Sequence, residues 1–177
     1  RRGVSATSVR EVVRYTETPR GSIAHHFPHG KQQLIEETVA FAGTAIATPM
    51  NKMLQEEGSV EGVRLFIAFW RKHLERTKFG SGCPVLAVCL EEASDMQGGA
   101  SCEGDTGEQV RLLDIANSVF DAWRSIIVEA LQRDGVSASR AESLATLCVA
   151  AIEGTVAMCR ASRNVQPLDD VGAELTL

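Results

Sequence analysis

The sequence predicts an all-helical protein with a small N-terminal part and a larger body. Apolar residues recur three or four positions apart through most of the 177 residues, which is the spacing of one face of a helix. Glycine and proline interrupt this pattern at only a few places, and these mark the ends of helices. No stretch shows the apolar–polar alternation that is typical of a β-strand. We therefore expect a bundle of helices without a sheet.

The N-terminal part is expected to contain two short helices and the start of a third. A helix is predicted from Thr7 to Arg14, with Thr7 as its N-cap. A second should open at Pro19, whose fixed φ suits a first turn, and end at Phe27. The third should begin at Lys31. Two short helices joined by a tight turn form a helix-turn-helix, the module that places its second helix in the major groove of DNA.

The body should consist of longer helices separated at glycine and proline. The helix from Lys31 is expected to reach about Met53, and Pro49 should kink it or end it nearby. A break follows at Gly58-Ser59. Further helices are predicted over 59–79, 85–94, 107–133 and 139–162.

Local signals predict the remaining boundaries in the C-terminal half. The segments 106–109 and 139–142 have the Ser/Thr-x-x-Glu/Gln order of capping boxes, which predicts that helices start there. Residues 96–107 contain four glycines and no apolar period, so a flexible loop is expected. Residues 167–177 are interpreted as a short tail.

Charge is distributed unevenly along the chain. The net charge is −5, yet residues 1–35 hold six Lys or Arg and two Glu, a net +4, so the remainder sums to −9. A basic head on an acidic body fits a protein that touches phosphates at one end only. The five cysteines are an odd number without a CxxC pair, which indicates a reduced, cytoplasmic setting.

Several protein classes are not indicated by the sequence. No uninterrupted apolar run reaches the roughly 18 residues needed to cross a bilayer, so no membrane partner is expected. No nucleophile–base pair, phosphate loop or paired carboxylates at motif spacing predicts an enzyme or a cofactor. His25, His26 and His29 have no carboxylate or cysteine nearby in sequence, and the adjacent pair points apart on a helix, so no metal site is expected.

The segment 20–34, RGSIAHHFPHGKQQL, resembles the TetR family of bacterial transcription regulators in its Gly-Ser-Ile-x-His-His-Phe-Pro-x-Gly-Lys order. The segments 82–85 (GCPV) and 151–154 (AIEG) resemble the LmrA/YxaF-like subgroup. Family members carry one further helix before this segment, so the chain is expected to lack the first helix of the head. Two positions depart from the family pattern. Ala24 replaces an aromatic residue, commonly Tyr, and Glu17 replaces the Gly of the turn, where a positive φ would cost on the order of 1 kcal/mol.

The resemblance implies a TetR-like fold, with a DNA-binding head at 1–38 and a ligand-binding and dimerisation domain at 39–177. It also implies a homodimer through the helices over 107–133 and 139–162. Double-stranded operator DNA is the expected partner. The residues expected to contact it, through phosphates or base edges, are Thr7, Arg20, Gly21, Ser22, Ala24, His25 and Lys31. The implied function is a repressor that a small apolar or aromatic effector releases from its operator.

The resemblance also implies an effector pocket between the middle helices, and we expect a cavity of roughly 300 Å³ or more. The residues expected to form it are Met53, Phe66, Trp70, Cys89, Phe120, Trp123 and Glu153. For each large apolar residue, ordinary core packing is an equally good interpretation. Glu153, in an otherwise apolar helix, could bind a ligand, pair across an interface or lie at a solvated edge.

Two other functions stay open. One is a helix-turn-helix regulator gated by thiol oxidation, with Cys83 near a helix start as the candidate thiol. The other is a helical ligand-binding domain whose head no longer binds DNA because of Glu17 and Ala24. The sequence identifies neither the effector nor the operator.

Overall fold

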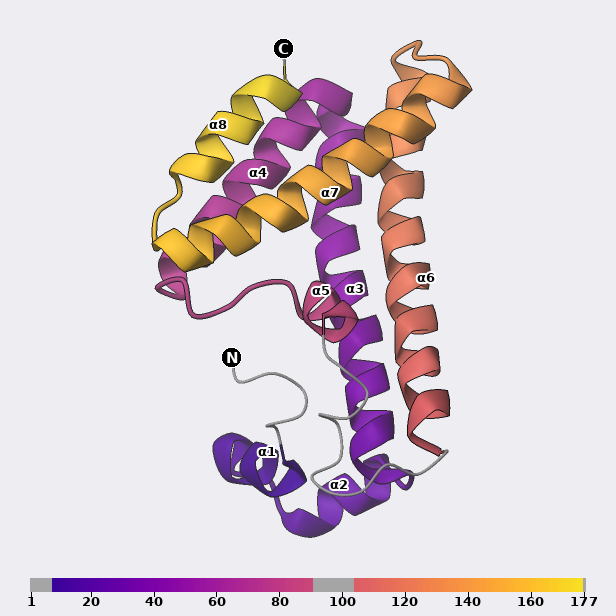
Figure 1. The fold of residues 1–177 in the computed structure, drawn as a ribbon, viewed down its shortest axis with the longest axis vertical. Helices are drawn as coiled ribbons and strands as arrows, with labels where there is room; N and C mark the ends of the chain where they lie inside the picture. The colour runs from indigo at the N-terminus through magenta and orange to yellow at the C-terminus, as the bar shows by residue number, and fades with distance from the viewer. Residues whose placement is uncertain (1–7, 91–103, 177) are drawn as a thin grey trace. The chain divides into compact units, whose positions relative to one another are not determined.

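The fold is all-helical over the described residues, 8–90 and 104–176 of a computed structural model (Figure 1). The helices there are α1 (Val9–Thr16), α2 (Arg20–His26), α3 (Gly30–Glu57), α4 (Ser59–Arg76), α5 (Pro84–Cys89), α6 (Gly104–Arg133), α7 (Ala138–Ser162) and α8 (Gln166–Leu175). The predicted all-α class is therefore confirmed.

The helices form two compact units. The C-terminal unit holds 43–83 and 119–176, and the N-terminal unit holds 8–42, 84–90 and 104–118 of the described residues. Helices α3 and α6 are each divided between the two units, with about half of each helix in each unit. The expected boundary between residues 38 and 39 stays a prediction.

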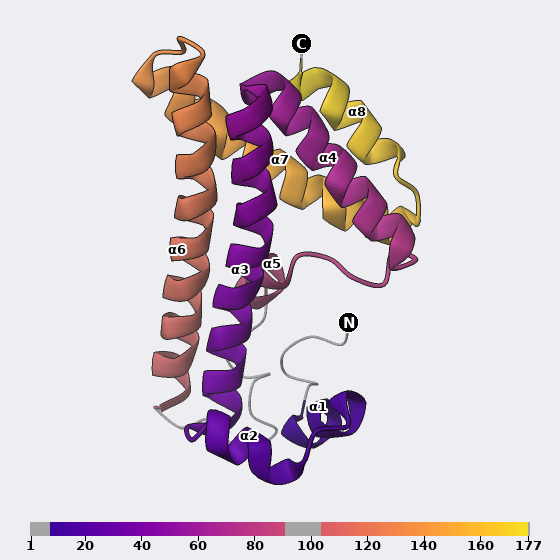
Figure 2. The same cartoon turned by 180° about the vertical axis from the view of Figure 1, so that it is seen from behind.

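In the C-terminal unit, α4, α7 and α8 pack against one another (Figures 1 and 2). Their apolar faces supply fully buried side chains such as Leu74 and Leu168. Gly62 permits a very close approach, because a Cβ there would lie 2.7 Å from the Cα of Leu54. The buried residues of α4 include the predicted face, Val63, Phe66, Ile67, Trp70 and Leu74.

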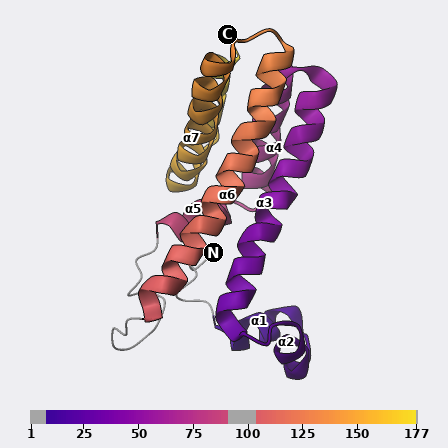
Figure 3. The same ribbon diagram turned by 90° about the vertical axis from the view of Figure 1, so that its right-hand side faces the viewer.

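The adjoining halves of α3 and α6 lie side by side in the same unit (Figure 3). The indole Nε1 of Trp123 donates a hydrogen bond to the carbonyl of Gly43 at 3.0 Å. A Cβ at Gly43 would lie 2.6 Å from the Val119 side chain, so only glycine allows this spacing. The guanidinium of Arg133 donates to the carbonyl of Leu54 at 2.9 Å.

In the N-terminal unit, polar side chains connect α3 and α6, and the unit also has an apolar core. The amide of Gln32 donates to the carboxylate of Glu36 at 2.9 Å and to the backbone carbonyl of Glu108 at 3.4 Å. Arg111 lies 3.7 Å from Glu36. The buried apolar residues of this unit are Ile23, Ile35, Val39, Val85, Val88, Leu112 and Ala116.

Several predicted boundaries are wrong. Pro49 lies inside α3, which continues to Glu57, past the expected end near Met53. Of the two expectations for Pro49 only a kink stays a prediction, while the predicted break at Gly58-Ser59 is confirmed. α4 stops at Arg76, and the backbone then turns through Lys78 and Phe79 with positive φ. α5 ends at Cys89, and residues 91–94 of its predicted span lie outside the described part of the chain, as does 96–103 of the predicted loop.

The predicted capping boxes and the C-terminal tail are also wrong. α6 begins at Gly104, so residues 104–107 are helical and Thr106 lies inside the helix. α7 begins at Ala138 after Ser137, so Ser139 does not cap it. Helix α8 replaces the expected tail. Its first turn contains proline, and its Leu168 is completely buried.

Candidate nucleic-acid interface

The first short helix, α1, begins one residue later than the sequence indicated. Ser8 is the N-cap, and its hydroxyl accepts a hydrogen bond from the backbone N–H of Glu11 at 3.2 Å. The expected cap, Thr7, lies outside the described residues. The helix ends at Glu17, which has φ 54° and ψ 25°, and its N–H donates to the carbonyl of Val13. The turn therefore does need a left-handed residue, and Glu17 occupies that position.

Three residues join α1 to α2, which makes a helix-turn-helix. The hydroxyl of Thr18 donates to that of Thr16 at 2.8 Å, inside the turn. Pro19 is the N-cap of α2, and Phe27 is its C-cap, as the sequence predicted to within one residue. The two helices contact each other directly.

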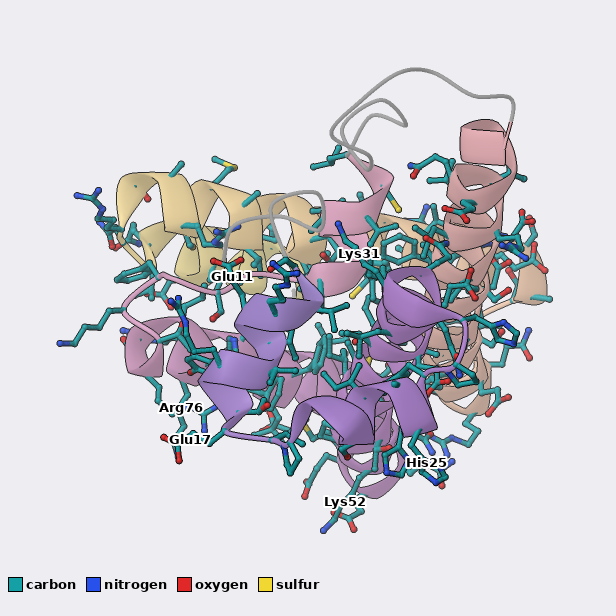
Figure 4. The ribbon with its side chains drawn as sticks, turned by 90° about the horizontal axis from the view of Figure 1, so that it is seen from below. Glu11, Glu17, His25, Lys31, Lys52 and Arg76 are labelled. Carbon is teal, nitrogen blue, oxygen red and sulfur yellow. The ribbon has the colours of Figure 1, made fainter. Side chains whose placement is uncertain are left out.

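Helix α2 has a buried face and an exposed face. Ile23 is buried and Phe27 is half-buried, as expected for the inward side. Gly21, Ala24 and His25 are exposed, and Figure 4 labels the His25 side chain. A Cβ built on Gly21 meets no atom of the described residues within 4 Å, so none of these residues covers this position.

The remaining expected DNA contacts within the described residues belong to α2 and α3. Ser22 is half-buried in α2, and Lys31 is half-buried in the first turn of α3. Arg20 is the first residue of α2. Sequence reasoning missed two exposed cations of α1, Arg10 and Arg14. Both residues contribute to the net positive charge of residues 1–35, but they were not predicted as DNA contacts because they precede the turn.

Gln33 also escaped the sequence interpretation, although it shapes the turn between α2 and α3. Its side-chain oxygen accepts from the backbone N–H of His29 at 3.0 Å, and its amide nitrogen lies 3.4 Å from the carbonyl of His26. Gly30, with φ 76°, begins α3, and its N–H donates to the carbonyl of Phe27 at 2.9 Å. These bonds hold α2 at a defined angle to α3.

The expected ligand residues separate into groups. Phe66, Trp123 and Glu153 line one small cavity in the C-terminal unit, with Met50, Ile127, Val149 and Ile152. The other candidates of this unit, Met53, Trp70 and Phe120, do not line it, although the Phe120 ring meets that of Trp123 edge-on at 5.4 Å. Cys89 belongs to α5, in the N-terminal unit.

The cavity is much smaller than expected. Its volume is about 10 Å³, the room of a single water molecule, so the expectation of roughly 300 Å³ at this place is wrong. A hollow of about 370 Å³ lies elsewhere, on the outside of α6 and the first turns of α7. Its lining is mostly polar, formed by Asp121, Arg124, Ser125, Val128, Glu129 and Glu142.

Glu153 is the buried acid of this cavity. It is 6% exposed, so the solvated-edge interpretation is wrong. Its Oε2 atom has no hydrogen-bond partner, while the thiol of Cys83 bonds to the carboxyl group. Burial raises the pKa of Glu153 to about 7, and the Cys83 bond opposes that rise.

Most of the described cysteines are buried. Cys83, Cys148 and Cys159 are buried, and Cys89 donates to the carbonyl of Val85 at 3.4 Å. Burial raises the pKa of Cys148 to about 11 and also raises that of Cys159. Because the thiolate is the reactive form, the environments of Cys148 and Cys159 do not favour their oxidation, and the alternative of a switch at Cys83 stays a prediction. Among the described residues no group of three His, Cys, Asp or Glu is placed to hold a metal ion.

Comparison with known protein families gives two matches that together span most of the chain. Residues 1–38 match the N-terminal domain of bacterial regulatory proteins of the TetR family. Residues 59–174 match the C-terminal domain of LmrA/YxaF-like transcriptional regulators.

Similar whole proteins agree with these matches. The HTH-type regulator Rv0196 of Mycobacterium tuberculosis is 34% identical over 98% of this chain and 84% of its own length. The regulators YxaF and LmrA of Bacillus subtilis are 26% and 25% identical, each over 94% of the chain, covering 81% and 82% of their lengths.

Solved structures share the fold. A TetR regulator of Rhodobacter sphaeroides has a TM-score of 0.78 at 19% identity, covering 98% of this chain and 88% of the other. One from Legionella pneumophila has a TM-score of 0.74 at 19% identity, covering 97% and 86%.

Proposed function

This chain belongs to the TetR family of bacterial transcription regulators, with an LmrA/YxaF-like C-terminal domain, and we propose that it is a repressor that reads its operator with α2. The exposed face of that helix carries the proposal. Ile23 anchors the inner side, so Gly21, Ala24 and His25 face outward without a covering side chain. A helix with one bare face of small and polar residues can enter a major groove and approach base edges.

Phosphate contacts would come from residues around that face. We assign this role to Thr7, Arg20, Ser22 and Lys31, and we add Arg10 and Arg14 as cations that raise affinity without reading sequence. Glu17 opposes them, because its carboxylate stands at the turn that would lie near the DNA backbone.

A homodimer through α6 and α7 would supply the second recognition helix. α7 supports this, because it carries an uncovered apolar surface in which Leu147 is 55% and Met158 is 60% exposed. Between them lies Gly154, where an added Cβ would meet no atom within 4 Å. Small residues on a helix surface let a second helix approach closely. The two copies of α2 would then read half-sites about 34–36 Å apart.

An effector that binds the C-terminal unit would end repression. The unit is closed around its small cavity, so an apolar or aromatic molecule would bind only a more open state. Such a ligand shifts the equilibrium by its difference in affinity between the two states, and DNA must weaken its binding by the same factor.

We also place the protein in the cytoplasm, where operator DNA is accessible. α7 is long and apolar enough to cross a membrane by length and composition. Its inner face packs against α4 and α8, and one such helix is weak evidence for a membrane span.

Operator binding is tested by fluorescence anisotropy with a labelled duplex from the region upstream of the protein's own gene. A scrambled duplex of equal length is the control. We expect at least 100-fold tighter binding to the upstream duplex at physiological salt. Equal affinity for both duplexes would favour the alternative of a ligand-binding protein whose head no longer reads DNA.

A further inference from the structure

Glu153 is the one residue with an ionisable side chain among those that line the small cavity of the C-terminal unit. The residue lies in the middle of α7 with 6% of its surface exposed. Its Oε2 atom lacks any hydrogen-bond partner. The rest of the lining is aliphatic or aromatic and is formed by Met50, Phe66, Trp123, Ile127, Val149 and Ile152. No cation therefore faces the carboxylate from the walls of the cavity.

The protein offers few hydrogen bonds to offset the burial of this carboxyl group. Among the described residues, the side chain that bonds to the carboxyl group is the thiol of Cys83, and a thiol is a weak donor. A buried polar atom without a partner is costly, and proteins keep few of them. An unpaired carboxylate oxygen on a residue beside an apolar cavity is the arrangement expected of a group that a ligand completes.

We propose that Glu153 Oε2 is the anchor for a positively charged nitrogen on an aromatic effector, a proposal that rests on the effector-regulated function above. A cation neutralises the buried charge, which a neutral hydroxyl does not. The rings of Phe66 and Trp123, which line the same cavity, attract a cation through their faces and pack against an aromatic body. An anionic effector is excluded by repulsion from Glu153.

Binding requires the cavity to open. Its present volume of about 10 Å³ holds at most one water molecule. Met50 is an unbranched, flexible side chain, and Val149 is half-buried, so these two wall residues can yield to a ligand at the least cost. The liganded C-terminal unit is therefore more open than the unit seen here, which is the differential binding that regulation needs.

The experiment compares two probes of nearly the same shape, 1-naphthylmethylamine and 1-naphthylmethanol, by titration calorimetry at pH 7. The amine is a cation at this pH and the alcohol is neutral. We expect the amine to bind at least tenfold more tightly. Glu153→Gln should lower the affinity for the amine at least tenfold and change the affinity for the alcohol less than threefold. Glu56→Gln, at an exposed position of α3, is the matched control and should change neither.

Proton release gives a readout that does not depend on a variant folding. Because the pKa of Glu153 is about 7, the carboxyl group is partly protonated at pH 7 and must lose its proton to hold a cation. Amine titrations in phosphate and in Tris buffer should therefore show release of roughly half a proton per site. Unequal heats in the two buffers support the anchor, and equal heats overturn it.

The remaining outcomes separate this proposal from the proposed function. Three results would overturn the proposed anchor. The first is equal affinity for the two probes, and the second is an equal loss of affinity for both probes in Glu153→Gln. The third is the absence of saturable amine binding up to millimolar concentration. The third result includes the case in which a water molecule is the only occupant of the cavity. Operator binding measured without any probe then shows whether DNA recognition stands by itself. If the amine binds and the affinity for the operator does not change, the result supports the binding site and contradicts its regulatory role.

Discussion

Asp134, just beyond α6, caps α4 across 75 residues of sequence by accepting a hydrogen bond from the backbone N–H of Ser59 at 2.7 Å. α4 has no cap of its own, because its N-cap residue is Gly58. The bonds from Ser59 lower the pKa of Asp134. This contact ties the ends of α3 and α6 to the start of α4, in the C-terminal unit.

Removing that cap should destabilise the C-terminal unit. Asp134→Ala should lower the free energy of unfolding by about 1 kcal/mol, the usual value for a lost N-cap, and urea denaturation measures it. Because folding lowers the pKa of Asp134, its contribution is present above the unfolded pKa and is lost as pH falls through the folded value. The difference between the two proteins should therefore shrink in acid. Glu56→Gln is the exposed control, and a difference that grows in acid would contradict the assignment.

Glu153 should make stability fall as pH rises. Folding raises the pKa of this group from 4.5 to about 7, so the folded state binds the extra proton between these values. The free energy of unfolding should then fall by up to about 3 kcal/mol between pH 4.5 and 7, at about 1.4 kcal/mol per pH unit. Glu153→Gln should remove this slope and be the more stable protein at pH 8. Parallel pH profiles for the two proteins would refute it.

Glu17 should lower both the stability of the N-terminal head and its affinity for DNA. Its φ of 54° is strained for a residue with a side chain, so Glu17→Gly should stabilise the head by about 1 kcal/mol. Glu17→Gln keeps the strain and removes only the charge. We expect both variants to bind operator more tightly at low salt, and only the glycine variant to raise the melting temperature. Equal melting temperatures would show that the turn carries no such strain.

Arg20 should contribute to DNA affinity without reading sequence. Arg20→Ala should weaken binding to operator and scrambled duplex alike, and should reduce the slope of log K against log salt by about 0.9. His25→Ala is the contrasting variant, because a base contact should lower discrimination between the two duplexes and leave the salt slope unchanged. Anisotropy titrations at several salt concentrations measure both effects. An unchanged slope in Arg20→Ala would exclude its phosphate contact.

Gly154 should lie in the dimer interface. Since an added Cβ meets no atom of the described part of its own chain within 4 Å, Gly154→Arg should leave the helical fold intact and break the dimer. Light scattering gives the mass, and circular dichroism confirms that the helices persist. Ala68→Arg, on the exposed face of α4, is the control and should remain dimeric. A monomeric unmodified protein would rule the interface out.

The sequence by itself determined the helical class, the helix-turn-helix and most helix spans in the body. The 3.6-residue apolar period is a local property, so the buried face of α4 from Val63 to Leu74 was readable without a structure. The left-handed turn at Glu17 was foreseeable through the resemblance to the TetR family, because Glu17 stands where the turn of that family usually carries Gly.

Tertiary structure decided the caps, the last helix and the cavity. The capping boxes at Thr106 and Ser139 failed because helix starts depend on partners elsewhere, as Asp134 caps α4. α8 is too short to be stable alone, and it forms where Leu168 is buried and Asp169 pairs with Arg71 at 2.7 Å. Phe66, Trp123 and Glu153 come from three helices, and only the packing of those helices brings them to one cavity and closes it to about 10 Å³. Burial and cavity volume are properties of side chains far apart in sequence, so no local pattern encodes them.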